Sequence, residues 1–324
     1  MRFAAGVDWV LELTVVGSFT RTGIVLRRSL FGWEDPAPDA LAGRTVLVTG
    51  PTSGLGRAAT ASLAALGARV ILAGRSEQRL GEVRDALVAE HGEDRFPLLV
   101  VDTGSLASVR DAVARVLATE PRLDVLVDNA GAIFPSRTEG PDGIESTLAT
   151  LVVGPFALIT GLLPLLRRTE GSRVICVTSG GMYSQAVPMD DLQYGVGEFS
   201  GPRAYARAKR IQVALVREWA RRLDGAVTIN AMHPGWADTP GLADQLPGFY
   251  ARMKPLLRTP AEGVDTIVWL ASAPAAGEGG GRLYLDRRPR PFDRVRRTRL
   301  SAAERRRLWD EIVGLSGAPD PAPG

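Results

Sequence analysis

The sequence predicts a doubly wound α/β fold of the Rossmann type, in which helices cover both faces of a mostly parallel sheet. From residue 44 to about residue 285, short β-rich runs alternate with longer helical patterns. The runs are apolar throughout, as in strands that are buried on both faces. A glycine-rich segment follows the first run and opens the first helical pattern. Together these features indicate successive βαβ units.

The elements of this domain follow one another in a regular order. Six β-rich runs are predicted strands: RTVLVTG, ARVILAG, FPLLVVD, LDVLVDNAG, SRVICVTS and AVTINAMHPG. The helical patterns between them cover 55–66, 77–90, 105–119, 142–168 and 201–223. No internal repeat interrupts the order, so we expect a single Rossmann-type domain over residues 41–286.

Two extensions flank this domain. Residues 1–40 form an N-terminal cap that ends in the proline-rich acidic hinge EDPAPD. Residues 287–324 begin with a basic arm, which we expect to be extended and solvated, and end in a disordered tail. Between arm and tail, Ser301 and Glu304 have the spacing of a capping box at a helix start. An apolar helix face follows, at Leu308, Trp309, Ile312 and Leu315.

Composition narrows the classes of function. The net charge of +3 is small, so we expect no nucleic-acid partner. The two histidines and the single cysteine, Cys176, argue against a metal site. One cysteine cannot form an internal disulfide, and the N-terminus does not resemble a secretory signal. We therefore expect a cytoplasmic protein.

The sequence suggests no membrane-spanning segment, because no run approaches about 18–20 uninterrupted apolar residues. The N-terminal run FTRTGIVLRRSLFGW mixes aromatic residues with arginines, as an interfacial membrane helix does. A cap packed on the domain, or a dimer contact, explains the same run. Peripheral membrane contact is thus a hypothesis that the sequence does not favour.

The segment VLVTGPTSGLG has the pattern of a phosphate-binding loop. Gly50, Gly54 and Gly56 allow a tight turn and let a phosphate approach the backbone at a helix N-terminus. The next strand ends in ILAGRS, where a site for NAD usually has a carboxylate for the ribose 2′-hydroxyl. Arg75 occupies this region instead, and its guanidinium suits a 2′-phosphate. The sequence therefore predicts NADP(H) in preference to NAD(H).

In AYARAKR, residues 204–210, Tyr205 and Lys209 share one face of a predicted helix because they are four residues apart. A free tyrosine has a pKa near 10, and a nearby ammonium group lowers it. The pair is therefore a candidate acid–base site. Lysine is otherwise rare here: Lys209 and Lys254 are the only two in the chain.

The chain from about residue 44 to about residue 285 resembles the short-chain dehydrogenases/reductases. The likeness rests on motifs in the order that family has: TGPTSGLG, Asp102 after the third strand, DNAG at 128–131, Ser179 in VTSGG, YARAK, and HPGWADT at 233–239. The fuller runs MHPGWADTPG, RTPAEGVDTIVWLA and LYLDRRP are similar to one subgroup of orphan reductases, called member twelve.

The resemblance implies a role for each matching residue. Tyr205 is the expected general acid or base, Ser179 binds the carbonyl oxygen, and Lys209 lowers the tyrosine pKa and binds the nicotinamide ribose. Relatives usually dimerise through the helices at 142–168 and 201–223, so a homo-oligomer is expected. The expected cofactor-binding residues are Gly50, Ser53, Gly54, Leu55, Gly56, Arg75, Asp102, Asn129, Ala130, Gly131, Tyr205, Lys209, Pro234, Gly235, Trp236 and Thr239.

The sequence departs from the family pattern at one catalytic position. Leu151, in ATLVVGPF, stands where the family usually has an asparagine that anchors a water in the proton path. Leucine can neither donate nor accept a hydrogen bond. Either the enzyme tolerates the change, or the chain is an NADP(H)-binding protein with weakened or lost turnover. Asp128 also replaces a frequent asparagine, and we expect it not to touch the chemistry directly.

Two loops, 181–203 and 236–258, are expected to face the substrate. Their side chains suggest an apolar pocket and a lipophilic carbonyl or alcohol such as a sterol, retinoid or long-chain aldehyde. The apolar members of these loops are Met182, Tyr183, Met189, Leu192, Tyr194, Phe199, Trp236, Leu242, Leu246, Phe249 and Tyr250.

Overall fold

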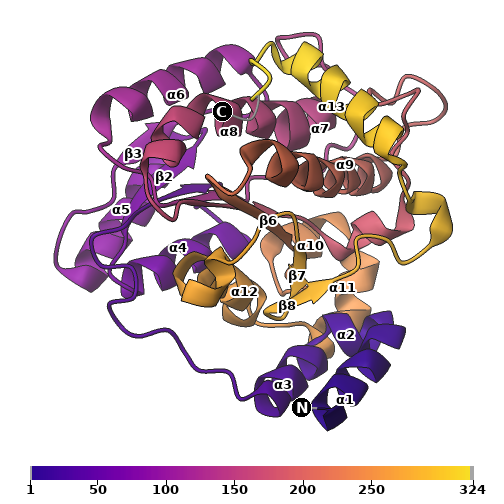
Figure 1. Cartoon of the computed structure of the whole chain (residues 1–324), viewed down its shortest axis with the longest axis horizontal. Coiled ribbons are helices and arrows are strands. Elements are labelled where there is room, and N and C mark those ends of the chain that lie inside the picture. Colours follow the sequence, from indigo (N-terminus) through magenta and orange to yellow (C-terminus); the bar gives the residue numbers. More distant parts are fainter. Residues whose placement is uncertain (1, 322–324) are drawn as a thin grey trace.

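A computed structural model describes residues 2–321, and within them one eight-stranded sheet forms the centre of the molecule (Figure 1). The strand order is β3-β2-β1-β4-β5-β6-β7-β8, parallel except for β8, which is antiparallel to β7. The predicted Rossmann-type fold is confirmed. The strands are β1 (Thr45–Thr49), β2 (Arg69–Gly74), β3 (Leu98–Val100), β4 (Val125–Asp128), β5 (Arg173–Val177), β6 (Thr228–Met232), β7 (Leu283–Leu285) and β8 (Arg288–Arg290).

Helices cover both faces of the sheet, and each layer has its own apolar core (Figure 1). One core lies under α4 (Gly54–Ala65), α5 (Glu77–His91) and α12 (Pro260–Ser272). The other lies under α6 (Leu106–Thr119), α8 (Gly154–Arg168) and α9 (Gly201–Leu223). Every residue of β1 and β4 is buried between them, which explains why these strands are apolar except at their ends, where Thr45, Thr49 and Asp128 lie.

The predicted helix at 142–168 is divided into three segments. They are α7 (Ser146–Leu148), η1 (Ala149–Val153) and α8, and η1 is a π-helical turn. Single π turns inside helices occur frequently at functional sites. Leu151 lies at the centre of this turn and is fully buried.

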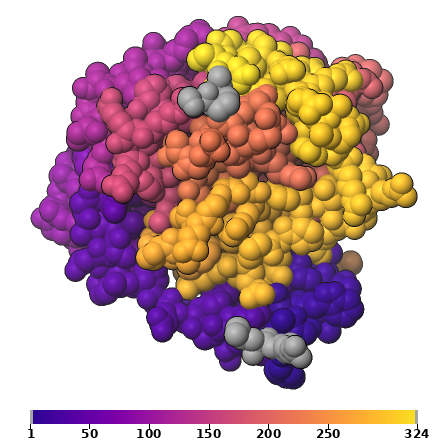
Figure 2. Space-filling model, viewed as in Figure 1, coloured from indigo at the N-terminus to yellow at the C-terminus, as the bar shows by residue number. Residues whose placement is uncertain are grey.

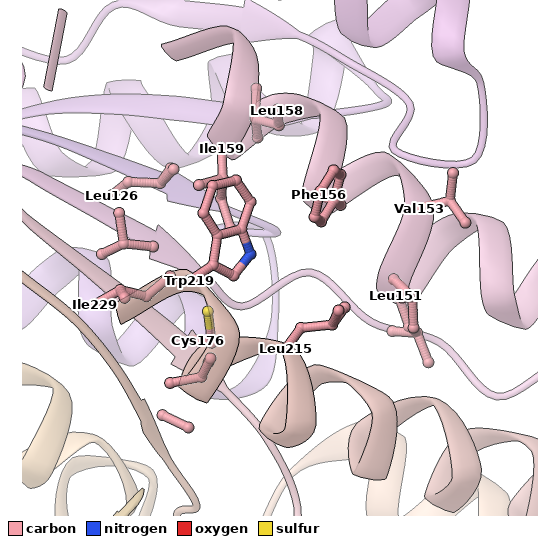
Figure 3. Packing of buried hydrophobic residues seen from close by; sticks show 14 of the residues in the cluster. Leu126, Leu151, Val153, Phe156, Leu158, Ile159, Cys176, Leu215, Trp219 and Ile229 are labelled. Atoms are coloured by element: carbon pink, nitrogen blue, oxygen red, sulfur yellow. The ribbon is translucent and has the colours of Figure 1, made fainter. Parts of the chain in front are cut away.

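The same segment is the one helix in residues 2–321 that is long and apolar enough to be compared with a membrane span. Residues Ser146–Arg168 reach a mean hydropathy of 2.0, which is enough for a span by length and composition alone. However, 78% of the most apolar stretch of this segment is buried inside the protein. The high hydropathy therefore reflects a core helix with several apolar sides, because the sheet, α9 and other helices surround it (Figure 3).

A C-terminal helix, α13 (Ala302–Ser316), packs across α8 and α9 (Figure 1). The predicted capping box of Ser301 and Glu304 is present. Trp309 is fully buried, and its ring lies 4.9 Å from the rings of both Phe156 and Trp219. A dimer formed through α8 and α9 would therefore include α13 in its interface or displace it.

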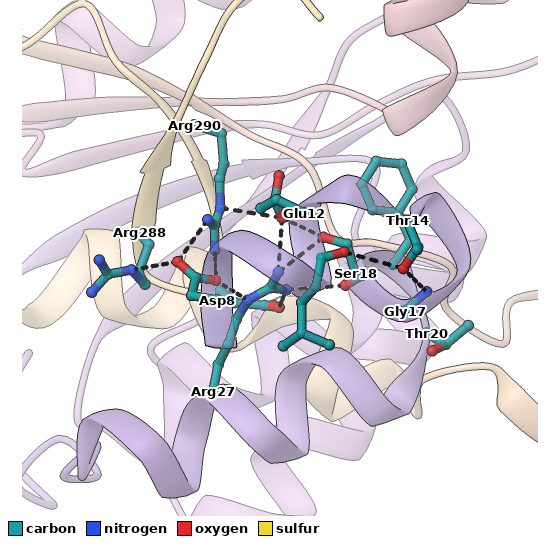
Figure 4. Close-up of polar contacts among 12 residues, drawn as sticks. Asp8, Glu12, Thr14, Gly17, Ser18, Thr20, Arg27, Arg288 and Arg290 are labelled. Atoms are coloured by element: carbon teal, nitrogen blue, oxygen red, sulfur yellow. Dashed lines mark hydrogen bonds and ion pairs between the residues drawn. The ribbon is translucent and has the colours of Figure 1, made fainter. Parts of the chain in front are cut away.

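Three helices form the N-terminal cap: α1 (Arg2–Leu13), α2 (Val15–Phe19) and α3 (Arg21–Phe31). Buried ion pairs join them to the end of the domain (Figure 4). Arg27, with 0% of its side chain exposed, contacts Asp8 at 2.7 Å, Glu12 at 2.7 Å and Asp286 at 2.5 Å. These pairs fix the cap beside β7 and β8. In Figure 2 the indigo surface of the cap borders the orange surface of the chain that contains these two strands.

The basic arm differs from our expectation of a solvated, extended segment. Part of it forms β8, and Arg290 is buried with both terminal nitrogens 2.9 Å from the Asp8 carboxylate. Arg294 binds Glu12 at 2.5 Å. The sequence could not reveal this, because the acidic partners lie about 280 residues earlier. The cap also exposes several large apolar side chains: Phe3, Trp9, Val10, Leu13, Val15, Val16, Val25 and Leu26.

Candidate active site

The predicted site residues lie mainly at the carboxyl ends of the parallel strands. The chain builds the sheet outward in one direction through β1, β2 and β3, and in the other from β4 onward. In such sheets, ligands bind at this switch point, outside the carboxyl ends of the strands. Gly50 follows β1, Arg75 follows β2, and Asn129 follows β4.

The glycine-rich loop has the shape that a phosphate site needs. Gly50 has a φ of 68°, a conformation that favours glycine. A Cβ at Gly56 would overlap the carbonyl oxygen of Gly50, so the turn closes only without a side chain there. Ser53 caps α4 without a side-chain hydrogen bond to the helix. The backbone N–H groups of the first turn are thus not capped by it and suit an anion.

Threonine and asparagine side chains fix the base of this loop. Thr49 Oγ1 accepts hydrogen bonds from the backbone N–H groups of Asn129 and Ala130, both at 2.9 Å. The Asn129 amide donates to the Thr49 carbonyl oxygen at 2.9 Å. Asn129 therefore ties β1 to the end of β4, in addition to any contact with a ribose. Sequence reasoning missed Thr49, which stands directly before Gly50.

The remaining loop residues support the same edge of the sheet. Leu55 packs against Gly263 of α12, because a Cβ at Gly263 would lie 2.7 Å from Leu55 Cδ2. Gly54 faces Thr239, which caps α10 (Pro240–Gln245). Arg75 is exposed and Asp102 half-buried, at the ends of the neighbouring strands β2 and β3. An exposed guanidinium at this edge fits the 2′-phosphate of NADP(H).

Hydrogen bonds hold α9 against the carboxyl end of β5. Thr178 Oγ1 donates to the carbonyl oxygen of Lys209 at 3.0 Å, and Lys209 Nζ donates to that of Val177 at 2.8 Å. The Ser179 hydroxyl accepts a hydrogen bond from the Gly181 backbone N–H at 3.3 Å. The serine and the Tyr205–Lys209 helix are thereby placed at one end of β5.

The electrostatics of this pair differ from our expectation. Desolvation raises the pKa of Tyr205 to about 12, and no lowering by Lys209 accompanies it. Lys209 Nζ lies 5.7 Å from the centre of the Tyr205 ring and is bonded to the strand instead. Desolvation also lowers the pKa of Lys209, which Asp128 partly opposes. In this state the phenol of Tyr205 stays protonated at neutral pH.

Asp128, which we expect not to touch the chemistry directly, is a buried carboxyl that interacts with Lys209. It is 2% exposed, and desolvation raises the pKa of its carboxyl to about 6, while the Lys209 charge and a hydrogen bond from Gln212 oppose the rise. The carboxylate is thus electrically coupled to the candidate catalytic lysine. Gln212, at 3.0 Å from Asp128, was missed by sequence reasoning, although it lies three residues after Lys209 on α9.

Leu151 lies close to the same lysine. A Cβ at Gly131 would lie 3.1 Å from Leu151 Cδ2 and 3.9 Å from Lys209 Nζ. Gly131 therefore separates the leucine side chain from the ammonium group by about the width of one residue. The side chain at position 151 brings an apolar surface to this region, as the sequence indicated.

The loop after β6 is held by the N-terminal cap. The Trp236 backbone N–H donates to the Phe19 carbonyl oxygen at 2.8 Å. The Arg258 guanidinium donates to the carbonyl oxygen of Pro234 at 3.1 Å and to that of Phe19 at 3.0 Å. The Phe19 ring fills the space beside Gly180, where a Cβ would overlap it. The cap thus reaches the residue next to Ser179. Phe19 begins the run FTRTGIVLRRSLFGW and Arg258 begins the run RTPAEGVDTIVWLA, but neither run predicted this contact.

The two substrate-facing loops are partly core. Met182, Tyr183, Leu192 and Tyr194 are buried, and the Tyr183 hydroxyl donates to the Pro291 carbonyl oxygen at 2.9 Å. Trp236 and Phe249, whose rings are 4.9 Å apart, are partly exposed on the second loop. That loop, which contains α11 (Pro247–Met253), also exposes the apolar side chains of Leu246 and Leu256.

His233 is packed and does not act as a site residue. It is fully buried, with its ring 4.6 Å from that of Phe19, and burial lowers its pKa well below the usual value. Within residues 2–321, no group of three or more His, Cys, Asp or Glu side chains is arranged to hold a metal ion.

Comparisons with known proteins agree on a family. The family model for short chain dehydrogenases matches residues 44–247. Dehydrogenase/reductase SDR family member 12 of Bos taurus is 39% identical over 289 residues, covering 87% of this chain and 90% of that protein. Polyprenol dehydrogenase of Mus musculus is 35% identical, covering 95% and 94%, and retinol dehydrogenase 14 of Mus musculus is 34% identical, covering 84% and 86%.

Solved structures share the fold. A protein from Mycobacterium paratuberculosis superposes with a TM-score of 0.68 at 27% identity, covering 86% of this chain and 94% of that one. A short chain dehydrogenase from Escherichia coli CFT073, in complex with NADPH, has a TM-score of 0.63 at 25% identity and covers 78% and 100%.

Proposed function

We propose that this chain, which belongs to the short-chain dehydrogenase/reductase family, is an NADP(H)-dependent oxidoreductase that interconverts a carbonyl group and an alcohol. Within the family it is close to the member-12 subgroup. The observation that carries the proposal is the attachment of α9 to the end of β5, which brings Ser179, Tyr205 and Lys209 to one end of one strand. A hydroxyl, a phenol and an ammonium group suffice to bind and protonate a carbonyl oxygen.

The cofactor residues fit a dinucleotide phosphate. The loop at Gly50–Gly56 and the start of α4 would hold the pyrophosphate, and Arg75 the 2′-phosphate. Lys209 would bind the nicotinamide ribose, and residues 234–239 would lie beside the carboxamide. When bound, NADPH supplies the hydride. Preference over NADH is supported by Arg75 and by related structures in complex with NADP and with NADPH.

The chain's own residues would manage the proton. The Ser179 hydroxyl would donate a hydrogen bond to the substrate oxygen and hold it near Tyr205. Because burial raises the pKa of Tyr205 to about 12, the phenol keeps its proton until the substrate oxygen becomes more basic, as a general acid requires. In the reverse direction, the Lys209 charge would favour the phenolate if the ammonium group moved from the Val177 carbonyl oxygen toward Tyr205, because in this state it does not lower the pKa of the phenol.

The substrate is proposed to be lipophilic. Relatives include a polyprenol dehydrogenase and retinol dehydrogenases, whose names refer to lipid alcohols. The partly exposed Trp236 and Phe249 on the second loop offer an apolar surface next to the loop after β6. A sterol, retinoid or long-chain aldehyde would suit it.

A second candidate function is a non-catalytic NADP(H)-binding protein. It is favoured by Leu151, which puts a buried apolar side chain beside Gly131 and Lys209. Such a protein would bind NADPH as a sensor or scaffold and turn over slowly or not at all.

Consumption of NADPH separates the two candidates. Wild type and Leu151→Asn are compared on a panel of lipophilic aldehydes and ketones, after both are shown to bind NADPH. Turnover by wild type supports the enzyme. Turnover by the asparagine variant alone supports a site silenced at Leu151. Tight binding without turnover by either, over the whole panel, contradicts the proposed activity.

The cytoplasmic location and the homo-oligomer remain predictions. Cell fractionation tests the first, and vesicle flotation tests peripheral contact through the exposed apolar side chains of the cap. Sedimentation of wild type and of a chain truncated before α13 tests whether that helix limits association through α8 and α9.

A further inference from the structure

Asp128 and Gln212 form a buried polar site beside Lys209. Asp128 is the last residue of β4, and Gln212 lies three residues after Lys209 on α9, within one helical turn. The Gln212 amide donates to Asp128 Oδ2 at 3.0 Å. Both side chains are at most 5% exposed. A carboxylate is seldom buried in this way without a charged partner.

The hydrogen bonding of this site is incomplete. Within residues 2–321, Asp128 Oδ1 and Gln212 Oε1 have no hydrogen-bond partner. Both residues line a cavity of about 20 Å³ between the sheet, α8 and α9. That volume holds one water molecule, and a water has two protons to donate to two such acceptors. The cavity's remaining walls are apolar except for the Cys176 thiol and the indole N–H of Trp219; Figure 3 labels Phe156, Ile159, Cys176, Leu215 and Trp219 among them.

Few charged or titratable groups surround the lysine. The titratable neighbours of Lys209 are Asp128 at the end of β4, Cys176 in β5 and Tyr205 on the same helix. The π turn contributes the apolar Leu151, and the cavity residues from α8 are apolar as well. The Cys176 thiol stays neutral at physiological pH, because burial raises its pKa well above the usual value. Asp128 is thus the anionic neighbour of Lys209.

We infer that Asp128, held by Gln212 and by one water in the adjoining cavity, is a positioning residue that keeps Lys209 protonated. In this role the Asp128 carboxylate, at the end of β4, is a polar group near Lys209, whereas the Leu151 side chain cannot form a hydrogen bond. The proposed function rests on a charged Lys209, and this inference names the group that maintains the charge. Without the carboxylate, the lysine would be buried with the Val177 carbonyl oxygen as its hydrogen-bond acceptor.

The chain offers a direct measurement, because it contains two lysines. Lysine labelled with ¹³C at the ε-carbon gives one NMR signal for Lys209 and one for the exposed Lys254. Their midpoints are followed against pH in the protein without cofactor or substrate. In wild type, the Lys209 midpoint is expected below that of Lys254, with a small inflection near pH 6 as Asp128 titrates.

Asp128→Asn removes the charge and keeps the shape. It is expected to lower the Lys209 midpoint by roughly one pH unit, since an opposite charge nearby favours the charged form. Lys254 should not move. Cys176→Ala, which changes the same cavity, should lower the Lys209 midpoint less than Asp128→Asn does, because Cys176 has a smaller effect on the pKa of Lys209 than Asp128 has. An unchanged midpoint in Asp128→Asn overturns the inference.

A second variant covers the case in which Asp128→Asn fails to fold. Gln212→Leu removes the hydrogen bond that lowers the Asp128 pKa, so the inflection of the Lys209 signal near pH 6 should move to higher pH. If wild type shows no inflection, or the variant leaves it in place, the coupling is refuted. Failure of the NADPH assay would refute the proposed activity and leave these titrations unchanged, because they require neither turnover nor nucleotide.

Discussion

Two buried charged clusters in this molecule differ in how completely their polar atoms are bonded. In the cap, Arg27 has contacts to Asp8, Glu12, Asp286, the Ser18 hydroxyl and the Ser18 carbonyl oxygen (Figure 4). Beside the candidate active site, Asp128 and Gln212 each keep one acceptor without a partner in residues 2–321. In the cap, Arg290 Nε is also without a hydrogen-bond partner among residues 2–321, but it lies 3.7 Å from Glu12 Oε1. A densely bonded cluster fixes one arrangement, whereas an incompletely bonded one leaves its pKa values sensitive to their surroundings.

The comparison suggests different roles for the two clusters. The cap network joins the two ends of the chain, from Asp8 to Arg290, and holds Phe19 against the loop after β6. We expect its loss to affect mainly stability. The Asp128 site is smaller and costs stability, because a buried carboxylate is poorly solvated. We expect its loss to affect mainly proton chemistry.

The largest expected effect is on the cap. Arg27→Met leaves Asp8, Asp286 and Glu12 without their common cation, so the free energy of unfolding should fall by about 3–5 kcal/mol. Denaturant unfolding measures it. Arg28→Met is the control, because Arg28 is exposed and pairs with the exposed Asp35, and about 0.5 kcal/mol or less is expected there. Equal losses in both variants would mean that the buried network does not stabilise the cap.

The second effect is a pH dependence of stability at Asp128. The folded-state pKa is raised to about 6 from a usual value of 3.8, so the folded form binds the proton more tightly than the unfolded form. Wild type should therefore lose stability relative to Asp128→Asn as pH rises from 4 to 7, by roughly 3 kcal/mol. Unfolding curves of both proteins at several pH values test this. Parallel pH dependence would show that Asp128 titrates normally.

A third effect tests the contact between cap and active site. Gly180→Ala places a Cβ in the Phe19 ring, so overpacking should cost about 1–3 kcal/mol and displace the segment next to Ser179. Gly181→Ala is the matched control, since its Cβ would meet its nearest neighbours at 3.7 and 3.9 Å, ordinary contact distances. Melting temperatures and NADPH turnover are compared. If the two variants behave alike, the cap does not constrain this end of β5.

The smallest effect concerns an exposed charge outside both clusters. Arg75→Ala should weaken NADPH binding by roughly tenfold and leave NADH binding nearly unchanged, because a charge-assisted bond to the 2′-phosphate contributes about 1.5–3 kcal/mol at most. Arg84→Ala, further along α5, is the control. Equal losses for the two nucleotides would remove Arg75 from the cofactor preference.

The sequence predicted the features that depend on local pattern. The six predicted strands, β1 to β6, the capping box at Ser301 and the glycine turn at Gly50 all follow from neighbouring residues. The strands β7 and β8 have three residues each and lie beside glycines and arginines, whereas the equally short β3 is flanked by apolar residues that extend its pattern. The Arg27–Asp286 pair joins residues 259 apart, and no pattern in a single sequence reveals such a contact.

The candidate site was predictable by residue type but not by electrostatics. The motifs placed Ser179, Tyr205 and Lys209 together, as their elements now indicate. Burial decides the pKa values, and burial is a tertiary property. For that reason the sequence suggested a lowered tyrosine pKa and an uninvolved Asp128, whereas desolvation raises both pKa values.

The most direct test of the central claim is the rate of NADPH oxidation by wild type and Tyr205→Phe with the same carbonyl substrate. Both proteins should bind NADPH equally, and the variant should lose about 10²–10⁴-fold in kcat, the usual contribution of a positioned general acid. An undiminished rate in Tyr205→Phe would contradict the assignment of Tyr205 as the proton donor.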